Sequence, residues 1–133
     1  MLASGADLIR TSLHILAVTV WVGGQITLLG LLPVLRAAGG DLPAQVARQF
    51  NRVAWPAFGV ALITGIWNIS EMADDRDTSV DVALMFKLIA VAISGVGAWW
   101  HSNTTNPAIR GASAAIGAIA ALAALVLGVS LSG

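Results

Sequence analysis

Hydrophobic residues fall in four long runs that are separated by short polar segments. The runs predict transmembrane helices at about residues 11–35, 53–70, 82–101 and 110–131. A helix that crosses a bilayer needs about 20 predominantly apolar residues, and each run approaches or exceeds that length. We therefore expect an all-α integral membrane domain over residues 1–133. Because short connections favour antiparallel neighbours, we expect a four-helix bundle with up-down-up-down topology.

The first run, TSLHILAVTVWVGGQITLLGLLPVL, has no formally charged side chain but carries a polar stripe. His14, Val18, Trp21 and Gln25 share one face of a helix with 3.6 residues per turn. Polar groups that face lipid are costly, so this stripe is expected to point toward protein. The other helices are then expected to close over it.

The composition narrows the class of protein. Hydrophobic residues make up 57% of the chain and charged residues only 11%, against about 25% charged residues in a soluble domain. The formal net charge is zero, which argues against a nucleic-acid partner. The chain has no cysteine, which removes disulfides, thiolate metal sites and cysteine nucleophiles. The first run is too long for a cleaved signal peptide and is expected to be retained.

Arginine is unevenly distributed among the connections. Residues 36–52 carry three arginines against one acid, whereas residues 71–81 carry five acids against one arginine. Arg110 lies beside the remaining short connection. Because cytoplasmic loops are enriched in Lys and Arg, we expect the arginine-rich connection in the cytoplasm and both termini outside. The predicted location is the cytoplasmic (inner) membrane.

Three ionisable residues fall inside or at the end of predicted spans: His14, Lys87 and His101. A lysine at the bilayer centre costs about 2.5–3.5 kcal/mol, so Lys87 is either a functional residue or one that snorkels to the outer headgroups. In the predicted topology His14 and Lys87 fall in one outer layer. His101 follows Lys87 by 14 residues, about 21 Å along a helix, so His14 and His101 are not expected to ligate one metal together.

His14 has two interpretations. A neutral imidazole is a common metal ligand, which makes His14 a candidate axial or metal ligand. The alternative is a histidine that is hydrogen-bonded to a backbone carbonyl, or to Thr64 or Asn68 of the second span. Trp21 lies two turns further along the same face. Core packing is expected there, and a flat ring would also suit a wall beneath a ring-shaped ligand.

The motifs around these residues resemble the copper-resistance protein D (CopD) family and the related HemJ-type protoporphyrinogen oxidases. The first helix has the pattern H-x6-W-x-G at His14, Trp21 and Gly23. The second has RQFNRVAWP and ALITGIWN, similar to the CopD pattern of an arginine–phenylalanine pair, a second arginine and a late T-G. The third carries Lys87 in FKLIAVAI, a lysine that both groups share. The resemblance covers about residues 10–103 and does not choose between the two branches.

The resemblance implies either copper handling or haem and porphyrin chemistry. In the HemJ branch His14 is the haem-associated histidine and Lys87 the essential lysine. Two features depart from the pattern. A histidine often found one turn before the end of the third helix is not at that place, since His101 comes later. The tyrosine-bearing loop of CopD is absent, because the chain has no tyrosine.

Ligand chemistry favours haem over copper. Copper(I) prefers thiolate and thioether ligands, and the chain offers no cysteine and only Met72 and Met85 after the initiator. A haem needs one histidine, an apolar slot and cations for its propionates, for which His14 and either Lys87 or Arg76 are candidates. We therefore predict a haem b ligated by His14, with Lys87 pairing a propionate or handling a proton. Electrons would pass between a reductant and the membrane quinone pool.

Two other functions remain open. One is copper transport or resistance across the cytoplasmic membrane, past His14. The other is a non-catalytic subunit of a larger membrane complex. The small residues of the fourth span suit close helix packing within the chain, and they would also suit a homo-oligomer.

Overall fold

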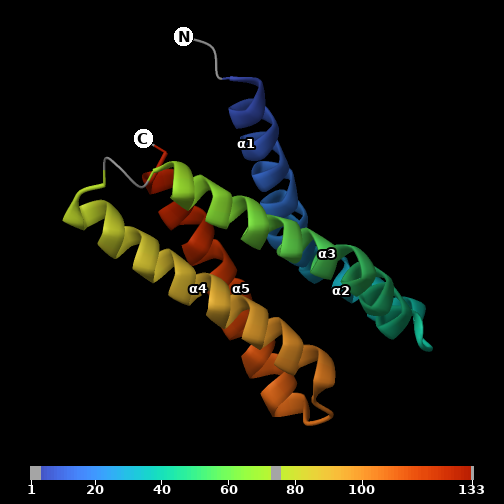
Figure 1. Ribbon diagram of the computed structural model, residues 1–133. Coiled ribbons are helices and arrows are strands. Elements are labelled where there is room, and N and C mark those ends of the chain that lie inside the picture. The colour runs from blue at the N-terminus through green and yellow to red at the C-terminus, as the bar shows by residue number, and fades with distance from the viewer. Residues whose placement is uncertain (1–3, 73–75, 133) are drawn as a thin grey trace. The chain divides into compact units, whose positions relative to one another are not determined.

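The computed structural model describes residues 4–72 and 76–132, which are helical apart from short connections and ends. The helices are α1 (Gly5–Val18), the π-helical turn η1 (Thr19–Gly23), α2 (Gly24–Ala38), α3 (Leu42–Glu71), α4 (Thr78–Asn103) and α5 (Pro107–Ser130) (Figure 1). Helices α1, η1 and α2 form one continuous segment. Four segments of the described chain are long and apolar enough to cross a membrane. The predicted all-α class with four apolar helices is therefore confirmed, and the protein is a multi-pass membrane protein.

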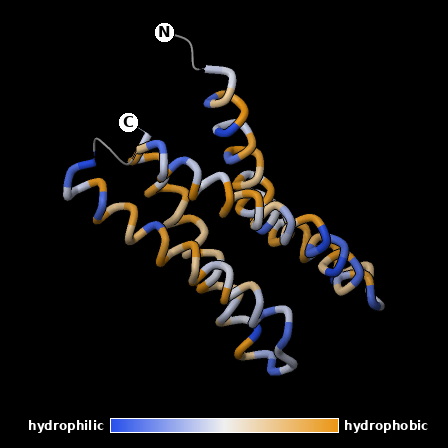
Figure 2. The backbone as a smooth tube through the Cα atoms, in the orientation of Figure 1, coloured by the Kyte–Doolittle hydropathy of each residue, from blue (hydrophilic) through white to orange (hydrophobic). Residues whose placement is uncertain are grey.

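The chain divides into two compact units, residues 1–74 and 75–133. In the first unit, the chain reverses at residues 39–41 and α3 returns along α2 and α1. In the second unit, α4 and α5 form a helical hairpin. Hydrophobic residues follow the length of the helices, and hydrophilic residues gather around the α2–α3 turn (Figure 2). The single bundle, its up-down topology and the orientation of the termini stay predictions.

All four helical segments begin earlier than their apolar runs predict. The observed segments are Gly5–Ala38, Leu42–Glu71, Thr78–Asn103 and Pro107–Ser130. Hydropathy alone omits a polar first turn, although side-chain caps hold such turns in helical form. His14 therefore lies nine residues, about two and a half turns, after the start of α1. The predicted run begins only three residues before His14.

Three capping side chains account for the early starts of α1, α4 and α5, whereas α3 begins with a proline in its first turn and has no side-chain cap. The Ser4 hydroxyl accepts the Asp7 amide, and the Asn106 side chain accepts the amides of Ala108 and Ile109. The Asp77 carboxylate accepts the Val80 amide at 3.0 Å. The N-terminal amides of a helix have no partner within the helix, so each cap supplies an acceptor for them.

The Asp77 cap lies outside the apolar span that it begins. Its carboxylate also accepts the Ser79 hydroxyl at 2.6 Å. Together the Ser79 hydroxyl and the Val80 amide lower the pKa of the Asp77 carboxyl below its ordinary value of 3.8. The carboxyl therefore stays ionised at neutral pH, where its negative charge also suits the positive end of the α4 dipole.

The second unit packs through small residues. A Cβ atom at Gly97 would lie 2.9 Å from the Gly117 Cα and 2.9 Å from the Ser113 carbonyl oxygen. These neighbours are backbone atoms, so only glycine at position 97 allows α4 and α5 to approach this closely. The buried residues of the two helices are Leu84, Ala90, Ser94, Gly95, Gly97, Gly117, Ala120 and Ala121. The predicted close packing of the fourth span within the chain is thus present.

Candidate ligand site between α1 and α3

The polar stripe of the first span is sheltered as the sequence predicts. Trp21 is buried, with 6% of its surface exposed. His14, Val18 and Gln25 are half-buried. Gln25 donates through Nε2 to the Trp21 carbonyl oxygen at 2.9 Å, so its amide serves the helix backbone locally.

His14 is held by Thr64 of α3. The His14 Nδ1 atom lies 2.8 Å from Thr64 Oγ1, and Thr64 is buried. The Thr64 hydroxyl lies 2.7 Å from the Val60 carbonyl oxygen, to which it donates its single proton. We therefore assign the proton of the imidazole to Nδ1, with Thr64 Oγ1 as its acceptor. This contact is the one expected for the alternative to a ligand role, a neutral histidine that is hydrogen-bonded to Thr64.

This tautomer decides which nitrogen of His14 can bind a metal. With the proton on Nδ1, the lone pair of the His14 ring is on Nε2. Histidines that ligate metals almost always donate their other N–H to a protein acceptor, which sets the tautomer and the orientation of the ring. The hydrogen bond between His14 and Thr64 therefore suits both interpretations of His14, as a ligand and as a histidine without one.

Gly65 lies against the imidazole edge. A Cβ atom at position 65 would sit 3.4 Å from His14 Cε1. A longer side chain there would displace the ring. Thr64 and Gly65 form the late T-G pair of the second span. The structure therefore brings this pair into contact with the histidine of the first span.

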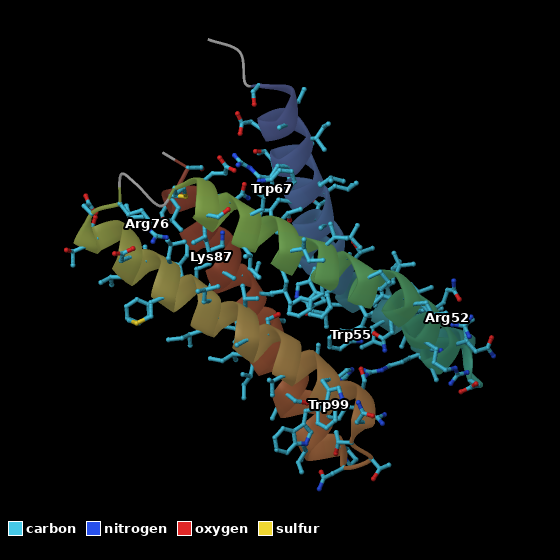
Figure 3. All side chains as sticks on the ribbon, in the orientation of Figure 1. Arg52, Trp55, Trp67, Arg76, Lys87 and Trp99 are labelled. Carbon is cyan, nitrogen blue, oxygen red and sulfur yellow. The ribbon has the colours of Figure 1, made fainter. Side chains whose placement is uncertain are left out.

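A charged cluster lies one turn before His14. Arg10 Nη2 is 2.9 Å from Asp7 Oδ1, and Arg10 Nη1 is 3.9 Å from Glu71 Oε2. The Arg10 Cζ atom lies 5.9 Å from the Trp67 ring centroid, and Trp67 Nε1 donates to Glu71 Oε1 at 3.2 Å (Figure 3). The Arg10 side chain is only 13% exposed. Its Nε atom is buried and has no hydrogen-bond partner among the described residues.

Sequence reasoning missed Arg10 as a site residue. It immediately precedes the apolar run that begins at residue 11, so hydropathy does not assign it to the first span. The signal that marks it is its spacing: Arg10 is four residues before His14, so the two side chains share one helix face. Arg10 belongs to the same unit and the same helix face as His14, so it is a candidate for binding an anionic group of a ligand there, which would replace Asp7 and Glu71 as its partner. Arg76 pairs with Asp81 at 3.3 Å in the second unit.

An aromatic cluster lies further along the same interface. The Trp21 ring centroid is 4.4 Å from that of Phe58 and 5.4 Å from that of Trp55. Such pairs contribute about 0.5–1.5 kcal/mol each beyond the area that they bury. Core packing is therefore what the contacts of Trp21 support; its predicted second role, a wall beneath a ligand, stays a prediction.

The π-helical turn explains how Trp21 reaches this position. A π turn holds one more residue than an α turn, and in η1 both Trp21 and Val22 are buried. The direction of the first segment changes where α1 passes into α2 (Figure 1). A π turn is a known cause of such bends.

Lys87 lies in the second unit, along α5. Its Nζ atom is 3.0 Å from the position that a Cβ atom at Gly128 would take, and Gly128 lies in the last turn of α5. The last turn of a helix carries the negative end of the dipole and carbonyl groups without helical partners, which attract an ammonium group (Figure 3). His14 belongs to the other unit, so the prediction that His14 and Lys87 share a site stays a prediction.

His101 has a partner in its own hairpin. Its Nδ1 atom lies 2.9 Å from the Arg110 carbonyl oxygen. The Arg110 guanidinium in turn donates to the Thr104 carbonyl oxygen at 2.7 Å and 3.2 Å. His101 thus stabilises the α4–α5 turn.

The described residues contain no group of three or more His, Cys, Asp or Glu side chains that could hold a metal ion together. Of the two methionines considered for copper, Met72 caps the C-terminus of α3 and Met85 is 51% exposed on α4. They belong to different units, and the copper alternative gains no support from either placement.

Removing the Thr64 hydroxyl should destabilise the first unit. Thr64→Val keeps the shape of the side chain but leaves His14 Nδ1–H without this acceptor, so we expect a loss of about 1 kcal/mol. Thr64→Ser retains the hydroxyl and should stay within about 0.5 kcal/mol of the wild type. Denaturant unfolding in mixed micelles measures both. Equal losses for the two variants would mean that the hydrogen bond does not contribute.

No protein-family model, curated protein or solved structure matches the chain. The resemblance to the CopD family and to HemJ-type oxidases therefore stays a prediction that depends on the motifs.

Proposed function

We propose that this multi-pass membrane protein binds a haem b or a porphyrin through His14 and belongs to the CopD/HemJ-like type. The observation that carries the proposal is the half-buried imidazole at the α1–α3 interface, which Thr64 orients from 2.8 Å. An axial ligand requires this restraint, because its ring must keep one tautomer and one direction. A histidine without a ligand makes the same kind of hydrogen bond, so the choice of haem depends on the motif that the chain shares with the HemJ type.

One neighbouring residue supports a ligand with acidic groups. Arg10 provides a sheltered guanidinium on the same helix face as His14, and the ligand would replace Asp7 and Glu71 as its partner. Gly65 provides the room that the imidazole itself occupies. Guanidinium groups bind carboxylates with strong, directed hydrogen bonds. When bound, a haem would supply one-electron chemistry between a reductant and the quinone pool.

Lys87 is included in the proposal because of the sequence motif FKLIAVAI. We assign it the transfer of a proton or the pairing of a propionate. Its ammonium lies beside the last turn of α5, 3.0 Å from the position that a Cβ atom at Gly128 would take. The arginine distribution of the loops supports a cytoplasmic-membrane location with both termini outside.

Absorption spectroscopy of the purified protein tests the proposal. We expect a red preparation, or one that turns red with added haem, with a Soret band at one haem per chain. A colourless protein that takes up no haem would contradict it. If that colourless protein bound copper(I), transport would replace haem chemistry. If it bound neither and co-purified with other subunits, the assembly role would replace both.

A further inference from the structure

Lys87 lies on the face of α4 that packs against α5. It is the only lysine in the sequence and comes nine residues after the first residue of α4. Leu84, Ala90 and Ser94, which are three or seven residues away from it, are buried. Residues at these spacings share one face of a helix, so Lys87 belongs to the packed face, where it is half-buried.

Two glycines on the facing side of α5 have different neighbours. Gly117, Ala121 and Gly128 follow one another at intervals of four and seven residues. A Cβ atom at Gly117 would lie 3.4 Å from backbone atoms of α4, so glycine there serves the close approach of the two helices. A Cβ atom at Gly128 would instead meet a side chain, with Lys87 Nζ at 3.0 Å and Lys87 Cε at 3.5 Å. The space at position 128 is therefore filled by the lysine.

This difference decides what a substitution at position 128 would move. The Lys87 ammonium is at the end of a flexible stem, so a side chain at position 128 would push the ammonium aside and leave the helices in place. Long cationic side chains near helix ends reach the lipid headgroups by snorkelling, and a displaced ammonium would move toward that layer. The residue at position 128 therefore selects between the two places that the ammonium can take.

We propose that Gly128 is a positioning residue for Lys87. The missing side chain at position 128 keeps the ammonium between α4 and α5, beside the last turn of α5, and away from the lipid headgroups. The value of this placement rests on the proposed function, because there Lys87 transfers a proton or pairs a propionate, and either task needs an ammonium that keeps one place. Gly97 and Gly117 bring the two helices together, and Gly128 leaves room between them for the one lysine.

Amine labelling of the haem-free full chain in neutral detergent micelles tests this placement. An amine-reactive ester modifies exposed lysines faster than sheltered ones, and mass spectrometry of the peptide that holds Lys87 separates its reaction from that of the chain terminus. We expect Gly128→Leu to label at least about threefold faster than the wild type, because the ammonium leaves the helix interface. Gly128→Ala should fall between the two, since a Cβ atom alone displaces the ammonium by a few tenths of an ångström.

Gly111→Leu is the matched control for the labelling experiment. It makes the same change on α5, where a Cβ atom meets nothing within 4 Å, and should label at the wild-type rate. An equal increase in Gly111→Leu and Gly128→Leu would overturn the proposal, and so would an unchanged rate in both Gly128 variants. Far-UV circular dichroism checks that the helices are intact, and Gly128→Ala decides the outcome if Gly128→Leu loses helix.

The same measurements separate this placement from the proposed function. Labelling needs no haem, so a wild type without a Soret band would contradict the proposed function and leave the labelling result valid. With haem bound, a Lys87 ammonium that pairs a propionate should be protected from the ester, and Gly128→Leu should lose that protection.

Discussion

Replacing His14 by alanine should abolish the Soret band of the purified protein. The imidazole is the only candidate axial ligand on the sheltered face of α1, and Thr64 orients it from 2.8 Å. Loss of an outer partner of a ligand typically lowers affinity about 10–100-fold, so loss of the ligand itself should lower haem affinity by about 100-fold or more. Haem titration followed at the Soret wavelength measures the difference between His14→Ala and the wild type.

Two variants make this result specific. His101→Ala removes the other histidine, whose partner is the Arg110 carbonyl oxygen, and should leave the Soret band unchanged. Thr64→Val should weaken haem binding about tenfold and keep the band, because the ligand remains but loses its orienting acceptor. Free imidazole added to His14→Ala should restore part of the band, which separates a lost ligand from a lost fold. An unchanged band in His14→Ala would refute the proposed function.

Replacing Gly97 by leucine should disrupt the α4–α5 hairpin. The first atom of the new side chain would lie 2.9 Å from the Gly117 Cα and from the Ser113 carbonyl oxygen. Both are backbone atoms, so no rotamer change relieves the overlap and the two helices must separate. Overpacking costs about 1–3 kcal/mol even where side chains can adjust, so we expect a loss of at least about 3 kcal/mol here. Denaturant unfolding in mixed micelles measures it.

Gly111→Leu is the matched control for this experiment. It makes the same change on α5, at a position where an added Cβ atom meets nothing within 4 Å. Leucine is a better helix former than glycine, so this variant should be neutral or up to about 1 kcal/mol more stable. Equal stability of Gly97→Leu and Gly111→Leu would show that the backbone contact between α4 and α5 does not limit the packing.

Hydropathy alone predicts the helices but not their ends. The four apolar runs correspond to four helical segments because a span of that length can satisfy its backbone hydrogen bonds only internally. The first turns of α1, α4 and α5 each contain a charged residue, and local capping by Ser4, Asp77 and Asn106 stabilises them as helix. The π turn also left no hydropathy signal, since its residues are as apolar as those around them.

The candidate site was predicted in part. Spacing placed His14 and Trp21 on one sheltered face, and Thr64 was one of the partners named for His14 in the alternative without a ligand. Arg10 was missed because the apolar run was taken to begin at residue 11. Gly65 was noted only as part of a motif, because its contact with the imidazole depends on the register between α1 and α3.

The amino-acid sequence by itself determined that this chain forms apolar helices, and which face of the first helix carries the polar stripe. Both follow from local properties: backbone hydrogen bonds within one segment, and the 3.6-residue repeat. Only the tertiary structure decided that Thr64 holds His14, that Arg10 is sheltered beside Trp67, and that Gly97 meets Gly117 backbone to backbone. Those contacts join residues on separate helices, and their register depends on the fit of two surfaces, which no single stretch of sequence encodes.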